Sequence, residues 1–325
     1  MLAYMKVNKI LIVLGEPQST FSEILLKYFT SKEFSKNKKK IILIGSKILF
    51  QKQMRKLKFN FKLKTINHLK EAAFKELNIL NVNYNNKKIF SKISSDSKKY
   101  ISNCFKTALD LIKNNKKILL INGPVSKKYF LNKKYLGVTE YISKKIKSKN
   151  QVMLIYNDRL SVSPVTTHLP LKYVAKNITK QKIINNIKQI KKFYYNFINK
   201  KPKIAILGLN PHCETIDKFS EEQKIIIPAI KYLKKINFKV EGPFSADTFF
   251  LKKNIDKYDV VVGMYHDQVL TPIKTLYNFN AINITLGLPF IRISPDHGPN
   301  NKMLGKNKSD PSSIFCAMRF IKKIR

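Results

Sequence analysis

The sequence predicts an α/β protein whose mainly parallel sheet is covered by helices on both faces. Short apolar runs of strand length alternate with amphipathic, helix-like stretches along the chain. The apolar runs are nearly continuous, as is typical of strands that are buried on both faces of a parallel sheet. None of them approaches the roughly 20 residues that a membrane-spanning helix requires, so we expect no membrane association.

Eight segments predict strands because each is rich in aliphatic residues and is bounded by charged or turn-forming residues. In chain order they are 9–15, 39–45, 116–124, 151–157, 161–168, 203–211, 259–266 and 281–289. Residues 95–115 and 171–200 carry apolar side chains at helical spacing and predict amphipathic helices. Ser220 followed by Gln223 offers a capping box for another helix, and Asp310 followed by Pro311 predicts the start of the last one.

The strong positive charge is interpreted as a solvated basic surface. The formal net charge is +43 and the pI is near 10.1, but only five of the 63 basic residues are arginine. Nucleic-acid-binding surfaces favour the planar guanidinium of arginine. The lysines are scattered along polar helix faces and are enriched together with Asn, Ile, Tyr and Phe. We therefore expect no nucleic-acid partner, and a basic nucleic-acid-binding protein is the alternative from a different functional class.

The cysteines and the amino-terminal residues indicate a cytoplasmic protein. Cys104, Cys213 and Cys316 are odd in number and lack CxxC spacing, which is typical of a reducing compartment. The first apolar run predicts a strand and not a signal peptide, because no small-residue cleavage site follows it.

Three of the five histidines follow strand-like runs within a few residues: His168, His212 and His266. In open α/β folds the carboxyl ends of parallel strands converge on the ligand crevice. Three imidazoles delivered there could hold a catalytic divalent metal and leave one coordination position open. Their separations of 44 and 54 residues exclude a local zinc-finger spacing. The alternative for each is a loop histidine that bonds the backbone, and His297 on a turn could have either role.

Two carboxylates accompany these histidines. Asp267 directly follows His266, and Asp247 lies in the segment EGPFSADTFF. A carboxylate beside a metal-binding histidine fixes the imidazole tautomer or becomes a ligand itself. Helix N-capping is the alternative role of Asp247.

Lys274, Asn283 and Arg292 interrupt an otherwise apolar region near the carboxyl end of the chain. In a chain with so few arginines, Arg292 indicates a bidentate partner such as a carboxylate or phosphate. A structural salt bridge is the alternative. The sequence contains neither GxGxxG after a strand nor GxxxxGK[ST], so a bound dinucleotide would require a topology other than the Rossmann fold.

Several blocks together resemble the 4-hydroxythreonine-4-phosphate dehydrogenase family. They are LGEPQSTFSEI, INGPVSKKYF, VTTHLPLKYVAKNIT, IAILGLNPHC, EGPFSADTFF, YDVVVGMYHDQVLTPIK, NITLGLPFIRISPDHG and DPSSI. The MYHDQ and NITLGLPFIRIS blocks are the most specific to this family, and the match is collinear from about residue 9 to residue 318.

The resemblance implies an isocitrate/isopropylmalate-dehydrogenase-like fold, which binds NAD without the Rossmann glycines. It further implies two interleaved subdomains with an interdomain cleft, and a homodimer whose active site is shared across the interface. We expect one subdomain to comprise residues 1–135 with 300–325, and the other residues 136–299.

The resemblance also implies an activity and its residues. The family oxidises 4-phosphohydroxy-L-threonine with NAD to a 3-oxo acid, which loses carbon dioxide to give 3-amino-2-oxopropyl phosphate in pyridoxal 5'-phosphate biosynthesis. The residues that hold one divalent ion (zinc, magnesium or cobalt) would be His168, His212 and His266. The residues that contact the small phosphorylated substrate would be Thr139, Lys274, Asn283 and Arg292.

Four departures from the family pattern concern the substrate more than the metal. Val138 stands where the family has a histidine, and Glu214 begins a segment without the usual glycine-rich turn. The opening loop lacks glycines between Pro17 and Glu23, and PNNK follows the DHG block. The first two departures favour an alternative activity. This alternative is a sister dehydrogenase for another four-carbon phosphorylated hydroxy acid, such as threonate or erythronate 4-phosphate.

Overall fold

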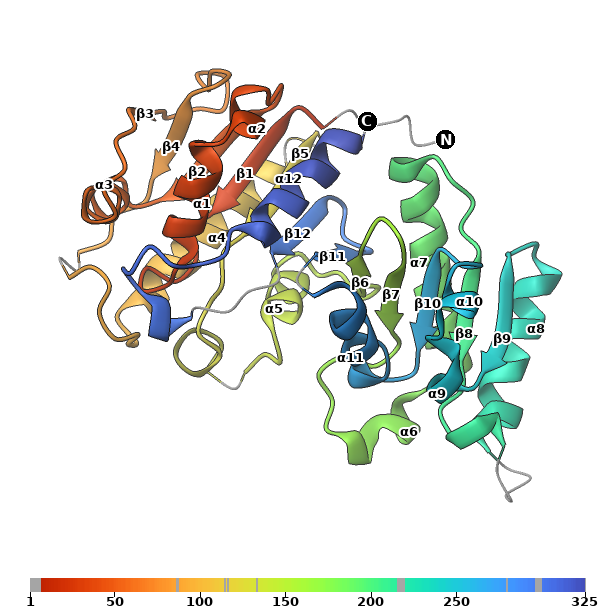
Figure 1. The fold of residues 1–325 in the computed structure, drawn as a ribbon. Coiled ribbons are helices and arrows are strands. Elements are labelled where there is room, and N and C mark those ends of the chain that lie inside the picture. The colour runs from red at the N-terminus through yellow and green to blue at the C-terminus, as the bar shows by residue number, and fades with distance from the viewer. Residues whose placement is uncertain are drawn as a thin grey trace. The chain divides into compact units, whose positions relative to one another are not determined.

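In a computed structural model of the chain, two compact units form around separate cores. Unit 1 comprises Met1–Ser148 and Leu288–Arg325, and unit 2 comprises Lys149–Gly287. The structure describes residues 7–85, 88–113, 115, 117–132, 134–214, 220–278, 280–295 and 300–324. Both units are α/β (Figure 1).

The limits of the units differ from the subdomain limits expected from the sequence. Residues 136–148 and 288–295 belong to unit 1 and not to the second unit. Helix α5 (Val138–Lys145) buries Tyr141 and Ile142 in the core of unit 1. Strand β12 (Ile291–Pro295) pairs with β5 (Ile118–Asn122) of the same unit.

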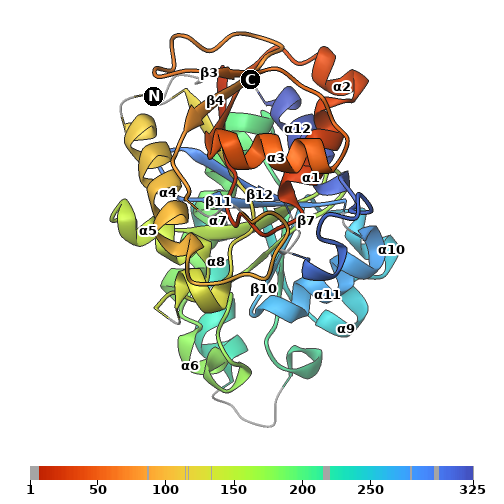
Figure 2. The same ribbon diagram turned by 90° about the vertical axis from the view of Figure 1, so that its left-hand side faces the viewer.

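The strands of unit 1 form a parallel arrangement. Their spatial order is β3 (Leu63–Thr65), β4 (Leu77–Asn81), β2 (Lys40–Gly45), β1 (Lys9–Val13), β5 and β12. Helices α1 (Phe21–Phe29), α3 (Lys47–Lys56) and α12 (Ser312–Lys323) are neighbours, and α1 packs against both of the others (Figure 2). Helix α4 (Ser97–Lys113) packs on β1 and β2.

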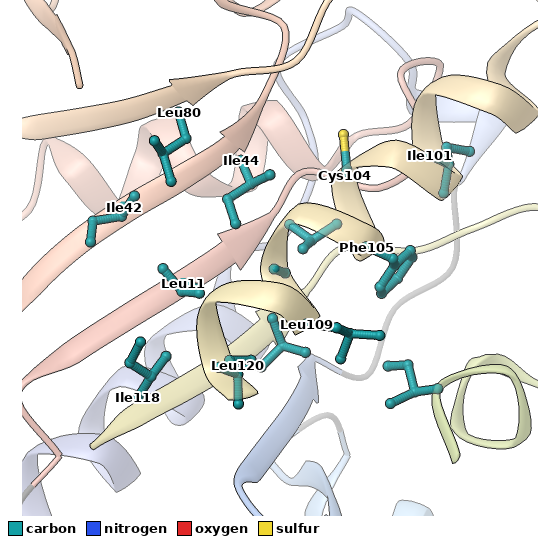
Figure 3. Close-up of a cluster of buried hydrophobic side chains, with 14 of the residues drawn as sticks. Leu11, Ile42, Ile44, Leu80, Ile101, Cys104, Phe105, Leu109, Ile118 and Leu120 are labelled. Carbon is teal, nitrogen blue, oxygen red and sulfur yellow. The ribbon is translucent and has the colours of Figure 1, made fainter. Parts of the chain in front are cut away.

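The core between α4 and the sheet explains why this segment is helical. Ile101, Cys104, Phe105 and Leu109 follow a spacing of three and four residues, so they form one stripe on α4. Figure 3 shows this stripe facing side chains of β1, β2 and β5 such as Leu11. Burial of each large apolar side chain contributes about 1.5–3 kcal/mol to stability.

The carboxyl-terminal segment is fastened to α1 by a buried acid and a lysine. The Glu23 carboxylate accepts a hydrogen bond from the backbone N–H of Ser309 at 2.6 Å. Lys27 donates from Nζ to the Ser309 carbonyl at 2.7 Å and to the Asn307 carbonyl at 3.1 Å. Hydrogen bonds between residues near the two ends of the sequence therefore hold unit 1 together.

Unit 2 has a mixed arrangement of strands. Their order is β11 (Ile282–Leu286), β6 (Val152–Tyr156), β7 (Ser161–Pro164), β10 (Val260–Gly263), β8 (Ile204–Leu207) and β9 (Val240–Phe244). Strand β6 is antiparallel to β11 and β7, whereas β7, β10, β8 and β9 are parallel. Helix α11 (His266–Tyr277) packs on β7 and β10, and α7 (Lys180–Phe193) packs on β6 and β11. Helix α8 (Ile227–Lys235) contacts α7 and β9.

Each of the eight predicted strand segments contains a strand, and the predicted helices are present as α4, α7, α8 and α12. The α/β fold with a mainly parallel sheet is confirmed, while β3, β4, β9 and β12 were not predicted. Helix α12 begins at Ser312, where the Asp310 carboxylate accepts a hydrogen bond from the Ser312 N–H at 2.8 Å. Across the residues that are described, we find no helix with the length and apolarity to cross a membrane.

Candidate active site

The three predicted metal ligands follow neighbouring strands of unit 2: His168 lies in a loop, His212 in the short helix Pro211–Cys213, and His266 is the first residue of α11. Strands β7, β10 and β8 are adjacent and parallel, so their carboxyl ends share one edge of the sheet. His168 follows β7, His266 follows β10, and His212 follows β8. The topology therefore places all three histidines beyond the carboxyl ends of parallel strands, at one edge of the sheet.

His168 and His266 lie side by side. Their ring centroids are 5.8 Å apart, and the rings are tilted by 38°. Two imidazoles on one tetrahedral ion, with metal–nitrogen bonds of about 2.1 Å and about 1.1 Å from each nitrogen to its ring centre, would have centroids about 5.2 Å apart. The observed separation is somewhat longer, so His168 and His266 lie near the spacing of two ligands of one ion.

The Asp267 carboxylate contacts His266 directly. The distance from His266 Nδ1 to Asp267 Oδ1 is 2.6 Å. A proton on Nδ1 would be shared with this carboxylate, which would leave Nε2 of the imidazole for an ion. Asp267 thus occupies the tautomer-fixing position that the sequence suggested for it.

His212 lies on a sharp turn, Pro211–Cys213, and its backbone φ of 57° is in the left-handed region. Its side chain is 74% exposed, and Nδ1 lies 3.8 Å from Asp247 Oδ2. This distance is beyond hydrogen-bond range. Within the described part of the chain, no three potential ligand side chains lie close enough together to hold a metal ion. The structure brings two of the histidines together and places the third beside a carboxylate.

Asp247 is not a helix N-cap. The N-cap of helix α9 (Ala246–Phe249) is Ser245, and Asp247 lies in the first turn. The Ser245 hydroxyl donates to Asp247 Oδ1 at 2.5 Å, and this hydrogen bond lowers the pKa of the Asp247 carboxyl. Asp247 therefore carries a negative charge beside His212, as a carboxylate that supports a metal-binding imidazole would.

The turn after β8 is held by Glu222, which sequence analysis missed. Glu222 is buried, and its Oε1 accepts hydrogen bonds from the backbone N–H groups of Leu209 at 2.7 Å and Asn210 at 2.9 Å. Burial alone would raise the pKa of Glu222, but these bonds outweigh burial and lower it. A charged, buried carboxylate therefore fixes the backbone just before His212.

Arg292 and Thr139, two of the predicted substrate residues, meet in unit 1. Arg292 is 2% exposed; its Nε donates to Asn122 Oδ1 at 2.8 Å and its Nη1 donates to Thr139 Oγ1 at 2.9 Å. Arg292 is paired with Leu120 in the sheet, so its side chain lies on the face that also carries Asn122, two residues further along β5. Asn122 was not predicted, because nothing in its local sequence points to Arg292.

Burial lowers the pKa of Arg292 to about 10, and the nearby Glu140 carboxylate opposes this shift. The two hydrogen-bond acceptors above are neutral groups. A guanidinium that is desolvated in this way is stabilised by anionic groups, and Glu140 is one of them.

Lys274 and Asn283 belong to unit 2. Lys274 lies on α11, two turns after His266, and is exposed. Asn283 lies in β11, and among the described residues its buried Oδ1 atom has no hydrogen-bond partner. A buried acceptor without a donor costs about 1–3 kcal/mol, so a ligand hydroxyl or ammonium group could be stabilised there.

Val138, which stands where the related family has a histidine, is the first residue of α5 and packs against the core of unit 1. Its neighbour Thr139 is the residue that contacts Arg292. Lys127 and Lys128 lie exposed on the short helix Lys127–Leu131. His297 lies outside the described residues, as does the segment that follows Glu214.

Comparisons with known proteins point to one family. Residues 37–321 match a family model described as "Pyridoxal phosphate biosynthetic protein PdxA". A 4-hydroxythreonine-4-phosphate dehydrogenase from Sulfurihydrogenibium sp. is 37% identical over 328 residues, which cover 98% of this chain and 99% of the relative.

Solved structures support the fold. The crystal structure of 4-hydroxythreonine-4-phosphate dehydrogenase from Klebsiella pneumoniae aligns with a TM-score of 0.83 at 24% identity, over 97% of this chain and 98% of that one. Isocitrate dehydrogenase from Methylococcus capsulatus aligns with a TM-score of 0.51 at 10% identity, over 97% of this chain and 85% of that one. The prediction of an isocitrate-dehydrogenase-like fold is therefore confirmed.

Proposed function

Because the chain belongs to the PdxA family of pyridoxal phosphate biosynthetic proteins, we propose that it oxidises 4-phosphohydroxy-L-threonine with NAD and one divalent metal ion. The secondary alcohol becomes a ketone, its hydride passes to NAD, and its hydroxyl proton leaves to solvent. The resulting 3-oxo acid then loses carbon dioxide to give 3-amino-2-oxopropyl phosphate. The observation that carries this proposal is the side-by-side placement of His168 and His266 at the ends of parallel strands.

The donor set suits the proposed ion. His168, His212 and His266 would hold it, with Asp267 fixing the orientation of the His266 ring and Asp247 lying near His212. Imidazole nitrogens favour zinc or cobalt over magnesium, which prefers oxygen ligands. When bound, the divalent ion supplies electrostatic stabilisation of the negative charge that develops on the substrate oxygen, and NAD supplies the hydride acceptor.

The remaining predicted residues bind and orient the substrate. Arg292 would hold an anionic group, supported by its burial and its two fixed hydrogen bonds. Thr139 orients the guanidinium, and Lys274 would add a second positive charge for the phosphate. The free acceptor of Asn283 would take a hydrogen bond from the substrate hydroxyl or amino group.

We further propose that the enzyme works as a cytoplasmic homodimer with an active site completed across the interface. The family resemblance supports the dimer. Three free cysteines support a reducing compartment.

The test is NADH formation from 4-phosphohydroxy-L-threonine by protein that was stripped with a chelator and then supplied with Zn²⁺, Co²⁺ or Mg²⁺. We expect turnover only with added metal, and loss of turnover in His266→Ala. No turnover under any of these conditions would refute the proposed function.

A sister activity is favoured by one observation, the valine at position 138, where the family has a histidine. Valine cannot donate the hydrogen bond that a histidine at this position could supply. Threonate and erythronate 4-phosphate should therefore be assayed beside 4-phosphohydroxy-L-threonine. A higher kcat/KM for either of them would replace the first proposal with the second.

A further inference from the structure

One side chain joins the backbones of two of the histidine-bearing loops. Gln268 lies in the first turn of α11, and its Oε1 accepts a hydrogen bond from the Met264 N–H at 2.7 Å. Its Nε2 donates to the Gly208 carbonyl at 2.7 Å, across 60 residues of sequence. Met264 precedes His266 by two residues, and Gly208 precedes His212 by four.

The loop after β7, which carries His168, is also hydrogen-bonded to Met264. The Met264 carbonyl accepts hydrogen bonds from the Thr166 N–H at 3.1 Å and from the Thr166 hydroxyl at 2.7 Å. Thr166 precedes His168 by two residues. Met264 and Gln268 therefore connect the loops of all three predicted metal ligands.

This junction is tightly packed. Met264 and Thr166 are buried, so their hydrogen bonds compete little with water. A side chain at position 208 would bring its Cβ to 2.5 Å from Cys213 Sγ, so this position has room only for glycine unless Cys213 moves.

We propose, on the basis of the proposed metal-dependent function, that Gln268 is a positioning residue that sets the affinity of the site for a divalent ion. It holds the loops after β8 and β10 at a fixed spacing before the ion arrives. The ion then binds without the cost of ordering these loops. Gln268 contacts neither substrate nor ion in this role.

A purely structural role for Gln268 predicts a different result. In that case its loss would lower the stability of unit 2 and leave the affinity for metal unchanged. Positioning predicts a loss of metal affinity in a protein that is still folded. Metal affinity and stability must therefore be measured on the same variants.

The experiment is a Zn²⁺ titration of the full chain against a competing chromophoric chelator, with urea unfolding measured in parallel. Gln268→Met keeps the approximate volume of the side chain and removes both hydrogen bonds. Thr166→Val removes only the hydroxyl bond to Met264 and provides an independent change at the same junction. Gln181→Met on the exposed surface of α7 is the matched control.

We expect Gln268→Met to weaken Zn²⁺ binding by roughly 10- to 100-fold, the usual effect of losing an outer partner of a metal site. Thr166→Val should weaken it less, and Gln181→Met should bind like the unmodified protein. If the unmodified protein binds Zn²⁺ through His266 and both junction variants bind it equally well, the positioning role is refuted and the metal site stands. If the unmodified protein binds no Zn²⁺, or if His266→Ala binds it equally well, the proposed metal site fails and the positioning role fails with it.

Discussion

Arg292→Lys separates the structural role of this residue from its proposed role in substrate binding. The guanidinium donates from Nε to Asn122 and from Nη1 to Thr139, in a pocket where it is 2% exposed. The ammonium group of lysine keeps the charge, but it cannot reproduce the planar guanidinium, whose N–H donors point in fixed directions. At least one of the two acceptors therefore loses its donor.

The effects of Arg292→Lys on stability and on catalysis can be estimated separately. A hydrogen bond that involves a charged group contributes about 1.5–3 kcal/mol, so the free energy of unfolding should fall by about that amount. If the guanidinium also binds an anionic substrate group through a second charge-assisted bond, kcat/KM should fall by about 10- to 150-fold. This range is the same 1.5–3 kcal/mol expressed as a ratio of rates.

Urea unfolding and steady-state NADH formation, measured on the same preparations, test both estimates. The control is Arg159→Lys, which changes an exposed arginine in a loop and should alter neither quantity. A lower unfolding free energy with unchanged kcat/KM would show that Arg292 is purely structural. No change in either quantity would refute the argument from the two hydrogen bonds.

Three further predictions follow from the described sites. Alanine at His168, His212 or His266 should abolish turnover and most Zn²⁺ binding in equilibrium dialysis while the protein stays folded; full occupancy in one variant would remove that residue from the site. Glu16 lies in the loop after β1 and is buried. Burial raises the pKa of Glu16 above its unfolded value, so its charge destabilises the fold at neutral pH and the destabilisation disappears as the pH falls through the raised pKa. Glu16→Gln should therefore raise the urea midpoint near neutrality but not in acid, and a lowered midpoint near neutrality would contradict this sign. Val138→His should leave KM for 4-phosphohydroxy-L-threonine equal or lower, and a higher KM would count against the proposed substrate.

The strands that sequence analysis missed are those with polar or irregular residues. Strand β3 has only one buried residue, Leu63, and β12 contains Arg292 and ends at Pro295. In β4, the buried Asn78 interrupts the apolar pattern, and its amide bonds to the backbone at Ala73 and Ile41. Hydrophobic periodicity identifies strands that are stabilised by apolar burial, and it cannot detect a strand whose polar residues find partners in the folded state.

The prediction of the site is also limited, because partners that meet only in the folded state leave no local pattern in the sequence. The histidines were identified because each follows a strand, which is a local signal. Gln268 and Asn122 act through hydrogen bonds to residues 60 and 170 positions away, so no local pattern marks them. The limits of the units were also hard to place, because the chain passes between them without a linker rich in glycine, proline or serine.

The discontinuity of unit 1 has a consequence for its biosynthesis. Strand β12 completes the pairing of β5, yet about 170 residues separate Asn122 from Ile291 in the chain. At translation rates of about 5–20 residues per second, the outer edge of β5 stays without its native partner for about 8–34 s on the ribosome. An unpaired strand edge is a template for association with other chains. Unit 2 is continuous in sequence and can fold during this interval, so we expect aggregation during synthesis to begin at unit 1.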